Sequence, residues 1–123
     1  MNVFEGLYKT DGITRQAEGA FRVSMSLNAD SEIYKAHFPT FPITPGAAIL
    51  QLAVEAFCAA QGRRFRLVSS RELKFLAPVI PPSDSSLVFE FTPASPEGEL
   101  KYSVQVYCSD TPRAKFSLCF LPL

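Results

Sequence analysis

Alternating apolar and polar residues near the N-terminus predict β-strands. The segments LYKTDGITR and AEGAFRVSMSL, which lie within residues 7–27, favour this conformation, and every other residue is apolar towards the end of the second segment. These apolar residues are Phe21, Val23, Met25 and Leu27. Because successive side chains on a strand point to opposite sides, the four residues share one face.

An almost wholly apolar segment, residues 46–60, predicts a helix. Thr44 is a suitable N-cap, and Pro45 suits the first helical position because its missing N–H would have no partner there. Gly62 can provide the left-handed C-cap that ends the helix. Since nearly every side of this helix is apolar, we expect it to be buried all round.

Four further strand-like segments follow the helix. They cover residues 64–79, 85–94, 100–110 and 113–123, with the turn-forming sequences IPPSD, SPEGE and TPR between them. One buried helix with about six strands, mostly linked as hairpins, predicts an α+β fold in which an antiparallel sheet wraps around the helix. The chain has the length of one ordinary domain and contains no repeat or linker, so we expect residues 1–123 to form a single domain.

The charge balance excludes some classes of partner. Twelve Lys and Arg residues offset twelve Asp and Glu residues, which gives no bulk charge for nucleic acid or a membrane surface. The longest apolar run is too short to span a bilayer. The first residues, MNVFEGLYKTDG, lack the basic and apolar regions of a secretory signal. We therefore expect a cytoplasmic protein with no nucleic-acid and no membrane partner.

The three cysteines are widely spaced and form no C-x-x-C motif. They are Cys58, Cys108 and Cys119. In a reducing compartment this pattern favours buried free thiols, and it offers too few ligands for a metal or redox site. We therefore expect no metal site at the cysteines.

Two motifs flank the predicted helix. Residues 36–46 read AHFPTFPITPG and contain the only histidine of the chain, His37, while residues 74–84 read KFLAPVIPPSD. They resemble G-H-F-P-G-x-P-x-x-P-G and K-F-x-x-P-V-x-P-G-D, the motifs of the bacterial 3-hydroxyacyl-carrier-protein dehydratases of fatty-acid synthesis, which have the hotdog fold. The resemblance covers about residues 28–84. Ala36 and Thr40 depart from it, because the family has glycine at both places.

The resemblance implies a dehydratase that acts on a 3-hydroxyacyl thioester without a metal or an organic cofactor. A histidine titrates near neutral pH, so His37 suits the base that takes the α-proton. An interior, hydrogen-bonded histidine is the alternative. The N-terminus of the helix, at Pro45 and Gly46, suits the thioester carbonyl, because free N–H groups and the helix dipole point there. Phe38 and Phe41 are candidates to line an acyl tunnel.

The general acid departs from the family pattern. Relatives carry Glu or Asp fourteen residues after the histidine and often Gln one turn later, whereas this chain has Gln51 and then Glu55. A Gln amide has no proton to give near neutral pH, and the loss of general-acid help costs about 10²–10⁴ in rate. The two residues share one helix face, so both are candidate catalytic residues.

Several hypotheses for the missing acid stay open. Glu55 takes the role, with a pKa raised by burial. Alternatively, a partner subunit supplies the carboxylate, since the family's active sites form at a dimer interface. In a third case the protein binds acyl thioesters without turning them over, and thioester hydrolysis is a further alternative. Glu55 also suits a simple ion pair with an arginine at the edge of the helix.

Basic residues gather just after the helix. They are Arg63, Arg64, Arg66, Arg71 and Lys74. They form either an ordinary solvated strand face or a docking patch for an acidic acyl carrier protein, and coenzyme A is the other carrier to consider. We also expect a homodimer, or a heterodimer with a second hotdog protein, built by strand pairing across open sheet edges.

Overall fold

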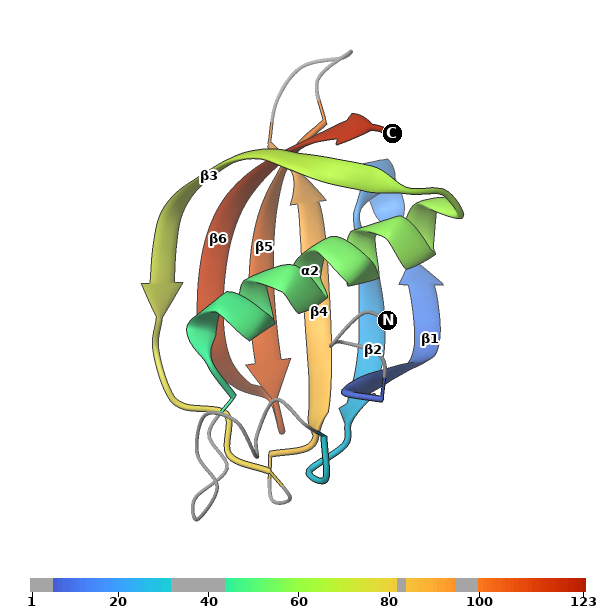
Figure 1. The fold of residues 1–123 in the computed structure, drawn as a ribbon. Coiled ribbons are helices and arrows are strands. Elements are labelled where there is room, and N and C mark those ends of the chain that lie inside the picture. The colour runs from blue at the N-terminus through green and yellow to red at the C-terminus, as the bar shows by residue number, and fades with distance from the viewer. Residues whose placement is uncertain (1–5, 32–43, 82–83, 95–99) are drawn as a thin grey trace.

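Six antiparallel strands and one long helix form the fold (Figure 1). The computed structural model describes residues 6–31, 44–81, 84–94 and 100–123, so His37, Phe38 and Phe41 lie outside the described residues. The strands are β1 (Tyr8–Arg15), β2 (Phe21–Leu27), β3 (Phe65–Phe75), β4 (Ser86–Pro93), β5 (Lys101–Cys108) and β6 (Thr111–Pro122). The helix α2 covers Gly46–Gln61, and a short 3-10 helix, η1 (Ala17–Gly19), separates β1 from β2.

The sheet has the order β1-β2-β4-β5-β6-β3, and all its neighbouring strands are antiparallel. Helix α2 lies across one face of this sheet, and β3 curves along the edge near the helix N-terminus (Figure 1). The predicted α+β fold, with about six strands around one helix, is confirmed. Strand β3 pairs with β6 on one side, and among the described residues no strand pairs with its other edge.

Apolar alternation places the core between the helix and the sheet. The face predicted for β2 is confirmed, because Phe21, Val23, Met25 and Leu27 are all buried. From the helix, Phe57 stacks on Phe120 of β6 with ring centroids 3.9 Å apart. Burying a side chain of this size stabilises the fold by about 1.5–3 kcal/mol, so these contacts hold the helix firmly on the sheet.

The helix boundaries agree with the prediction to within a residue at the C-terminal end. Gly62 ends the helix with a φ of 72°, and its N–H donates to the carbonyl of Cys58 at 2.9 Å. Most of the helix is buried, as expected, and only Ala47, Ala59 and Gln61 are exposed.

The predicted N-cap is wrong by one residue. Pro45, and not Thr44, is the N-cap: its backbone is extended, and its carbonyl accepts the N–H groups of Ala48 and Ile49. Thr44 is buried, and its own N–H donates to the carbonyl of Val79 at 2.8 Å. The backbone of Thr44 is thus bonded to the segment after β3.

One turn also differs from the prediction. The last hairpin turns at Ser109 and Asp110, while Thr111 of the expected TPR turn already belongs to β6. Both turn residues have positive φ, 51° and 63°. A two-residue turn of this kind matches the right-handed twist of the two strands, which explains why it forms ahead of the proline.

Cys58 and Cys108 are buried, Cys119 is partly buried, and all three are free, as predicted.

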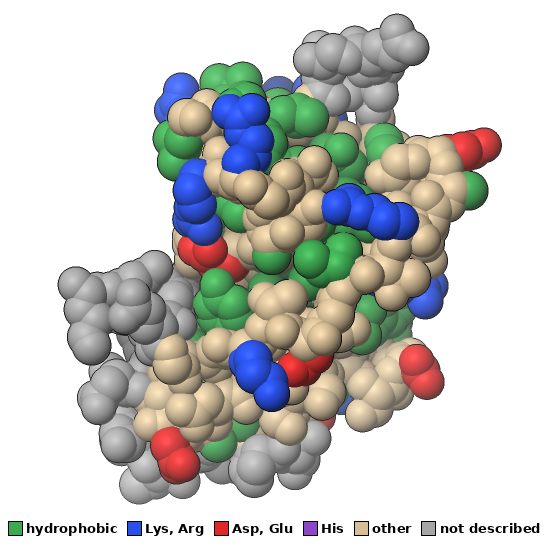
Figure 2. Space-filling view, turned by 90° about the vertical axis from the view of Figure 1, so that its right-hand side faces the viewer, with side chains coloured by type: hydrophobic (Ala, Val, Ile, Leu, Met, Phe, Trp, Pro, Cys, Tyr) green, Lys and Arg blue, Asp and Glu red, His purple; other side chains and the backbone are tan. Residues whose placement is uncertain are grey.

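On the side of the molecule that faces right in Figure 1, basic and acidic side chains are interspersed with apolar and uncharged surface (Figure 2). Among the described residues, no helix is both long and apolar enough to cross a membrane.

Candidate active site

An apolar cavity of about 540 Å³ lies at the N-terminus of α2. It is lined by Thr44, Gly46, Ile49, Phe75, Leu76, Ala77, Pro78 and Val79. The helix contributes Gly46 and Ile49, Thr44 lies just before the helix, and the end of β3 with the segment after it contributes the rest of the wall. Such a cavity suits a chain of methylene groups with a polar head at the helix end.

Gly46 allows the ring of Phe75 to come close to the helix. A Cβ atom placed on Gly46 would lie 2.8 Å from Cζ and 3.0 Å from Cε1 of Phe75. The ring of Phe75 also packs edge-on against the ring of Phe116 in the core, with ring centroids 5.7 Å apart, although Phe75 as a whole is 51% exposed. Phe75 is therefore a half-exposed wall of the cavity, directly above the first helical residue.

The first N–H groups of α2 are available for a ligand. Gly46 and Ala47 begin the helix, where no intrahelical acceptor exists, and no side chain caps this end. Within the described residues, no acceptor is paired with either N–H group. The positive end of the helix dipole adds to the attraction for a carbonyl oxygen or an oxyanion. The cavity thus combines apolar walls with hydrogen-bond donors at one end.

Glu55 lies in a different environment. Its carboxylate is 8% exposed and accepts two hydrogen bonds from Arg64, at 2.7 and 3.2 Å. Gln51 donates its amide N–H to the same carboxylate at 3.2 Å, and the Tyr8 hydroxyl donates at 3.5 Å. Four donors therefore surround one carboxylate.

The expected rise in the pKa of Glu55 is wrong. The hydrogen bond from the Arg64 guanidinium lowers the pKa of Glu55 and outweighs the burial that would raise it. In turn, burial and the nearby Glu55 carboxylate raise the pKa of Tyr8. Glu55 is ionised at neutral pH, and an ionised carboxylate has no proton to donate.

Gly46 and Glu55 do not share a cavity within one chain. They are nine residues apart, which corresponds to about 13 Å along the helix axis. Glu55 instead lines a hollow of about 460 Å³ at the C-terminal half of α2, together with Tyr8, Cys58 and Arg64. Gln51 lies between the two places and is partly buried.

The basic residues predicted as a patch are all exposed but divide into two groups. Arg64 pairs with Glu55, and the guanidinium of Arg63 lies 5.4 Å from the ring centre of Phe65. The others, Arg66, Arg71 and Lys74, lie along β3. In the register of the sheet Lys74 faces Lys115 of β6, so two like charges are adjacent there.

Sequence reasoning missed several cavity residues. They are Ile49, Phe75, Leu76, Ala77, Pro78 and Val79. All of them except Ile49 stand in the second motif, KFLAPVIPPSD, and that motif was the available signal.

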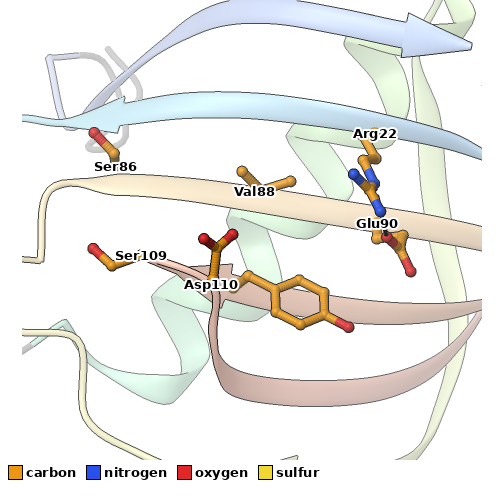
Figure 3. Close-up of a pocket in the computed structure, with 7 residues that line it drawn as sticks. Arg22, Ser86, Val88, Glu90, Ser109 and Asp110 are labelled. Carbon is orange, nitrogen blue, oxygen red and sulfur yellow. Dashed lines mark hydrogen bonds and ion pairs between the residues drawn. The ribbon is translucent and has the colours of Figure 1, made fainter.

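A second hollow, of about 530 Å³, lies on the face of the sheet away from α2 (Figure 3). Arg22 of β2 and Glu90 of β4 form an ion pair at 2.7 Å on one side of it. Ser86, Ser109 and Asp110 lie on the other side. Most of its lining side chains are polar or charged, and the helix N-terminus lies on the other face of the sheet (Figure 1), so we do not assign the chemistry to this hollow.

The comparison with protein families decides the class. The model of the ApeI-like family, described as ApeI dehydratase, matches residues 13–116. The chain belongs to the ApeI-like dehydratase family. This result agrees with the dehydratase class inferred from the two motifs, without singling out the enzymes of fatty-acid synthesis. Among curated proteins, none is significantly similar in sequence to this chain.

Solved structures confirm the hotdog fold of this family member. The ApeI:P dehydratase heterocomplex from Xenorhabdus doucetiae superposes with a TM-score of 0.67 at 16% identity, covering 91% of this chain and 96% of that chain. A putative thioesterase from Lactococcus lactis gives 0.68 at 12% identity, covering 100% and 99%. The PaaI protein from the phenylacetic acid degradation operon of E. coli gives 0.63 at 16% identity, covering 98% and 83%.

Proposed function

We propose that this protein is a subunit of a dehydratase that converts a 3-hydroxyacyl thioester into the trans-2-enoyl thioester and water. The observation that carries the proposal is the apolar cavity at the N-terminus of α2, which Gly46 lines and where the Gly46 N–H has no intrahelical acceptor. Membership of the ApeI-like dehydratase family supports the reaction class.

The chemistry needs a base, an acid and a group that stabilises negative charge. His37 takes the proton from the α-carbon as the charge moves to the thioester oxygen. The N–H of Gly46, at the positive end of α2, donates a hydrogen bond to that oxygen. The electron pair then forms the α–β double bond, and the β-hydroxyl leaves as water after it receives a proton. His37, Phe38 and Phe41 lie outside the described residues, and their roles rest on the motif.

We propose that the acid comes from a partner subunit. Arg64 keeps Glu55 ionised, which removes the main argument for Glu55 as the acid. Gln51, whose amide donates to Glu55, is left to orient the hydroxyl without protonating it. The similarity to a dehydratase heterocomplex supports a second hotdog protein that carries the carboxylate.

The open edge of β3 is the proposed place of contact with that partner. Apolar side chains along and just after this strand are exposed: Val68, Leu73, Phe75 and Leu76. Natural proteins cover such edges, and a second strand would satisfy the unpaired backbone groups while it buries these side chains. The contact would bring the partner next to the cavity, because Phe75 and Leu76 belong to both places.

An acyl carrier protein is the proposed carrier of the substrate. Arg66, Arg71 and Lys74 are exposed on β3, and the adjacent Lys74 and Lys115 repel each other unless an anion lies between them. An acidic carrier surface would relieve that repulsion. Coenzyme A, with its phosphates, is the competing carrier, and comparing KM for the two thioesters distinguishes them.

Turnover decides between this proposal and its rivals. The purified protein is assayed for formation of enoyl thioester from 3-hydroxyacyl thioesters, alone and with hotdog proteins from the same genome. We expect slow turnover alone and an increase of about 10²–10⁴ with the right partner, which is the range of general-acid help. Binding without turnover in any combination would indicate an acyl-binding protein, and release of free acid would indicate a thioesterase, the description of one structural neighbour.

A further inference from the structure

The loop between β3 and β4, residues 76–85, forms one wall of the candidate active site. Its described part is residues 76–81, 84 and 85, and Leu76, Ala77, Pro78 and Val79 line the cavity. The loop also reaches the helix, because the carbonyl of Val79 accepts the N–H of Thr44. The shape of the cavity and the entry into α2 therefore depend on how this loop is held.

The described part of the loop contains no helix or strand. Its sequence, LAPVIPPSDS, contains three prolines, each of which lacks a backbone donor. Contacts with other parts of the chain must therefore hold it. Leu27 donates its N–H to the carbonyl of Ser85 and the thiol of Cys108 donates to Asp84, but most of the contacts involve Arg113 of β6. The backbone carbonyl of Arg113 accepts the N–H groups of Leu76 and Ala77 at 2.8 and 3.3 Å.

The side chain of Arg113 binds the loop at two further residues. Its guanidinium donates to the carbonyl of Pro78 at 2.7 Å and to both carboxylate oxygens of Asp84 at 3.0 and 3.2 Å. Asp84 in turn accepts the backbone N–H of Ile80 at 3.0 Å. The ion pair is mostly buried, with side-chain exposures of 14% for Arg113 and 20% for Asp84. The two ends of the loop are thus tied to a single residue.

We propose that the Arg113–Asp84 pair positions the substrate by fixing this loop against the N-terminus of α2. The proposal rests on the function assigned above, because it concerns the same cavity. Neither side chain lines the cavity, so the two are positioning residues that act through Pro78, Val79 and Thr44. The planar fork of arginine is required, because one lysine ammonium cannot span the carbonyl and both carboxylate oxygens in the same geometry.

The test compares Arg113→Lys and Asp84→Asn with the parent. Arg22→Lys is the matched control, since Arg22 forms an arginine–carboxylate pair with Glu90 on the same sheet, away from the loop. Two quantities are measured well below the melting temperature. One is the Kd for a stable ketone analogue of octanoyl-pantetheine, in which a methylene replaces the sulfur. The other is the hydrogen-exchange rate of the Thr44 amide by NMR.

We expect Arg113→Lys and Asp84→Asn to weaken binding of the analogue about tenfold, since a displacement of about 1 Å at a site has effects of this order or larger. Exchange at Thr44 should become faster in both, and Arg22→Lys should change neither quantity. Unchanged binding in the Arg113 and Asp84 variants would overturn the proposal, with or without faster exchange. An equal loss of binding in Arg22→Lys would overturn it as well.

The test of the positioning role can be distinguished from the test of the proposed dehydration reaction. If the parent binds the analogue and the variants behave as expected, the positioning role stands, even where no partner yields dehydration. If the parent does not bind the analogue at all, the cavity is not an acyl site, and the positioning role is refuted.

Discussion

Replacing Gly46 by proline removes one N–H group from the candidate active site and changes little else. Gly46 is the first residue of α2, so its N–H takes part in no intrahelical bond. Proline is favoured at this position. The preceding residue, Pro45, has φ −60° and ψ 146°, the extended conformation that a residue before proline needs. The backbone therefore accommodates the substitution.

Alanine introduces the same Cβ atom and keeps the N–H group, which makes Gly46→Ala the control for the Cβ contact. In both variants a Cβ atom meets the ring of Phe75 at 2.8 Å. The ring is half exposed and moves away at modest cost. The two variants then differ in the N–H group and in the two further ring carbons of proline, and only the N–H group can bind an oxyanion. Removing one oxyanion donor typically costs about 10²–10³ in kcat, or about 2.7–4 kcal/mol.

The assay measures kcat/KM for a 3-hydroxyacyl thioester, with the partner subunit if one is needed, and the melting temperature of each variant. We expect Gly46→Pro to fall at least about a hundredfold below Gly46→Ala while both remain folded. Equal activity of the two variants would refute the reasoning, because the thioester oxygen would then lie elsewhere.

Four further predictions follow from the site, the core and the ion pairs. Glu55→Gln should keep most of the partner-supported activity, and a loss above about 10² would show that Glu55 is the acid after all. Gln51→Glu combined with Glu55→Gln, which restores the family arrangement, should raise the turnover of the protein without a partner. Phe57→Ala should reduce the free energy of unfolding by about 3–5 kcal/mol in urea titrations, because Phe57 stacks on Phe120 in the core. Hydrogen bonds lower the pKa values of Glu55 and Asp84 below their ordinary values near 4. The two carboxylates therefore contribute fully to stability above about pH 4–5, and this contribution is lost as pH falls through the lowered pKa values. Denaturation at pH 7 and pH 3 should show a smaller loss of stability at acid pH in Glu55→Gln and Asp84→Asn than in the parent.

Local patterns in the sequence were sufficient for most of the fold. The period of two in β2 and the apolar segment of α2 predicted which faces are buried, because both signals arise from neighbouring residues. Gly62 was recognisable as the C-cap for the same reason. The errors arose where distant parts of the chain meet. Thr44 lies one residue before the N-cap, and its backbone N–H is bonded to Val79, 35 residues later.

In the candidate site, too, local features could be predicted from the sequence and contacts between distant residues could not. Gly46 could be located at the start of a helix from its sequence, but the walls of its cavity come from Phe75 and the loop after it. The low polarity around Glu55 was visible in the sequence and suggested a raised pKa. The opposite shift depends on the position of the Arg64 guanidinium, which pattern reasoning does not supply. Arg113 stands in no motif, so its contacts with the loop are visible only in the structure.

The central claim is that this chain provides the base and the oxyanion donor while a second hotdog protein provides the acid. The most direct measurement is the rate of enoyl thioester formation by this protein with a hotdog partner, compared with the same mixture in which this chain carries His37→Ala. We expect the parent mixture to dehydrate the substrate and the His37→Ala mixture to be slower by about 10²–10⁴. Equal rates in the two mixtures would contradict the account, because His37 of this chain would then take no part in the reaction.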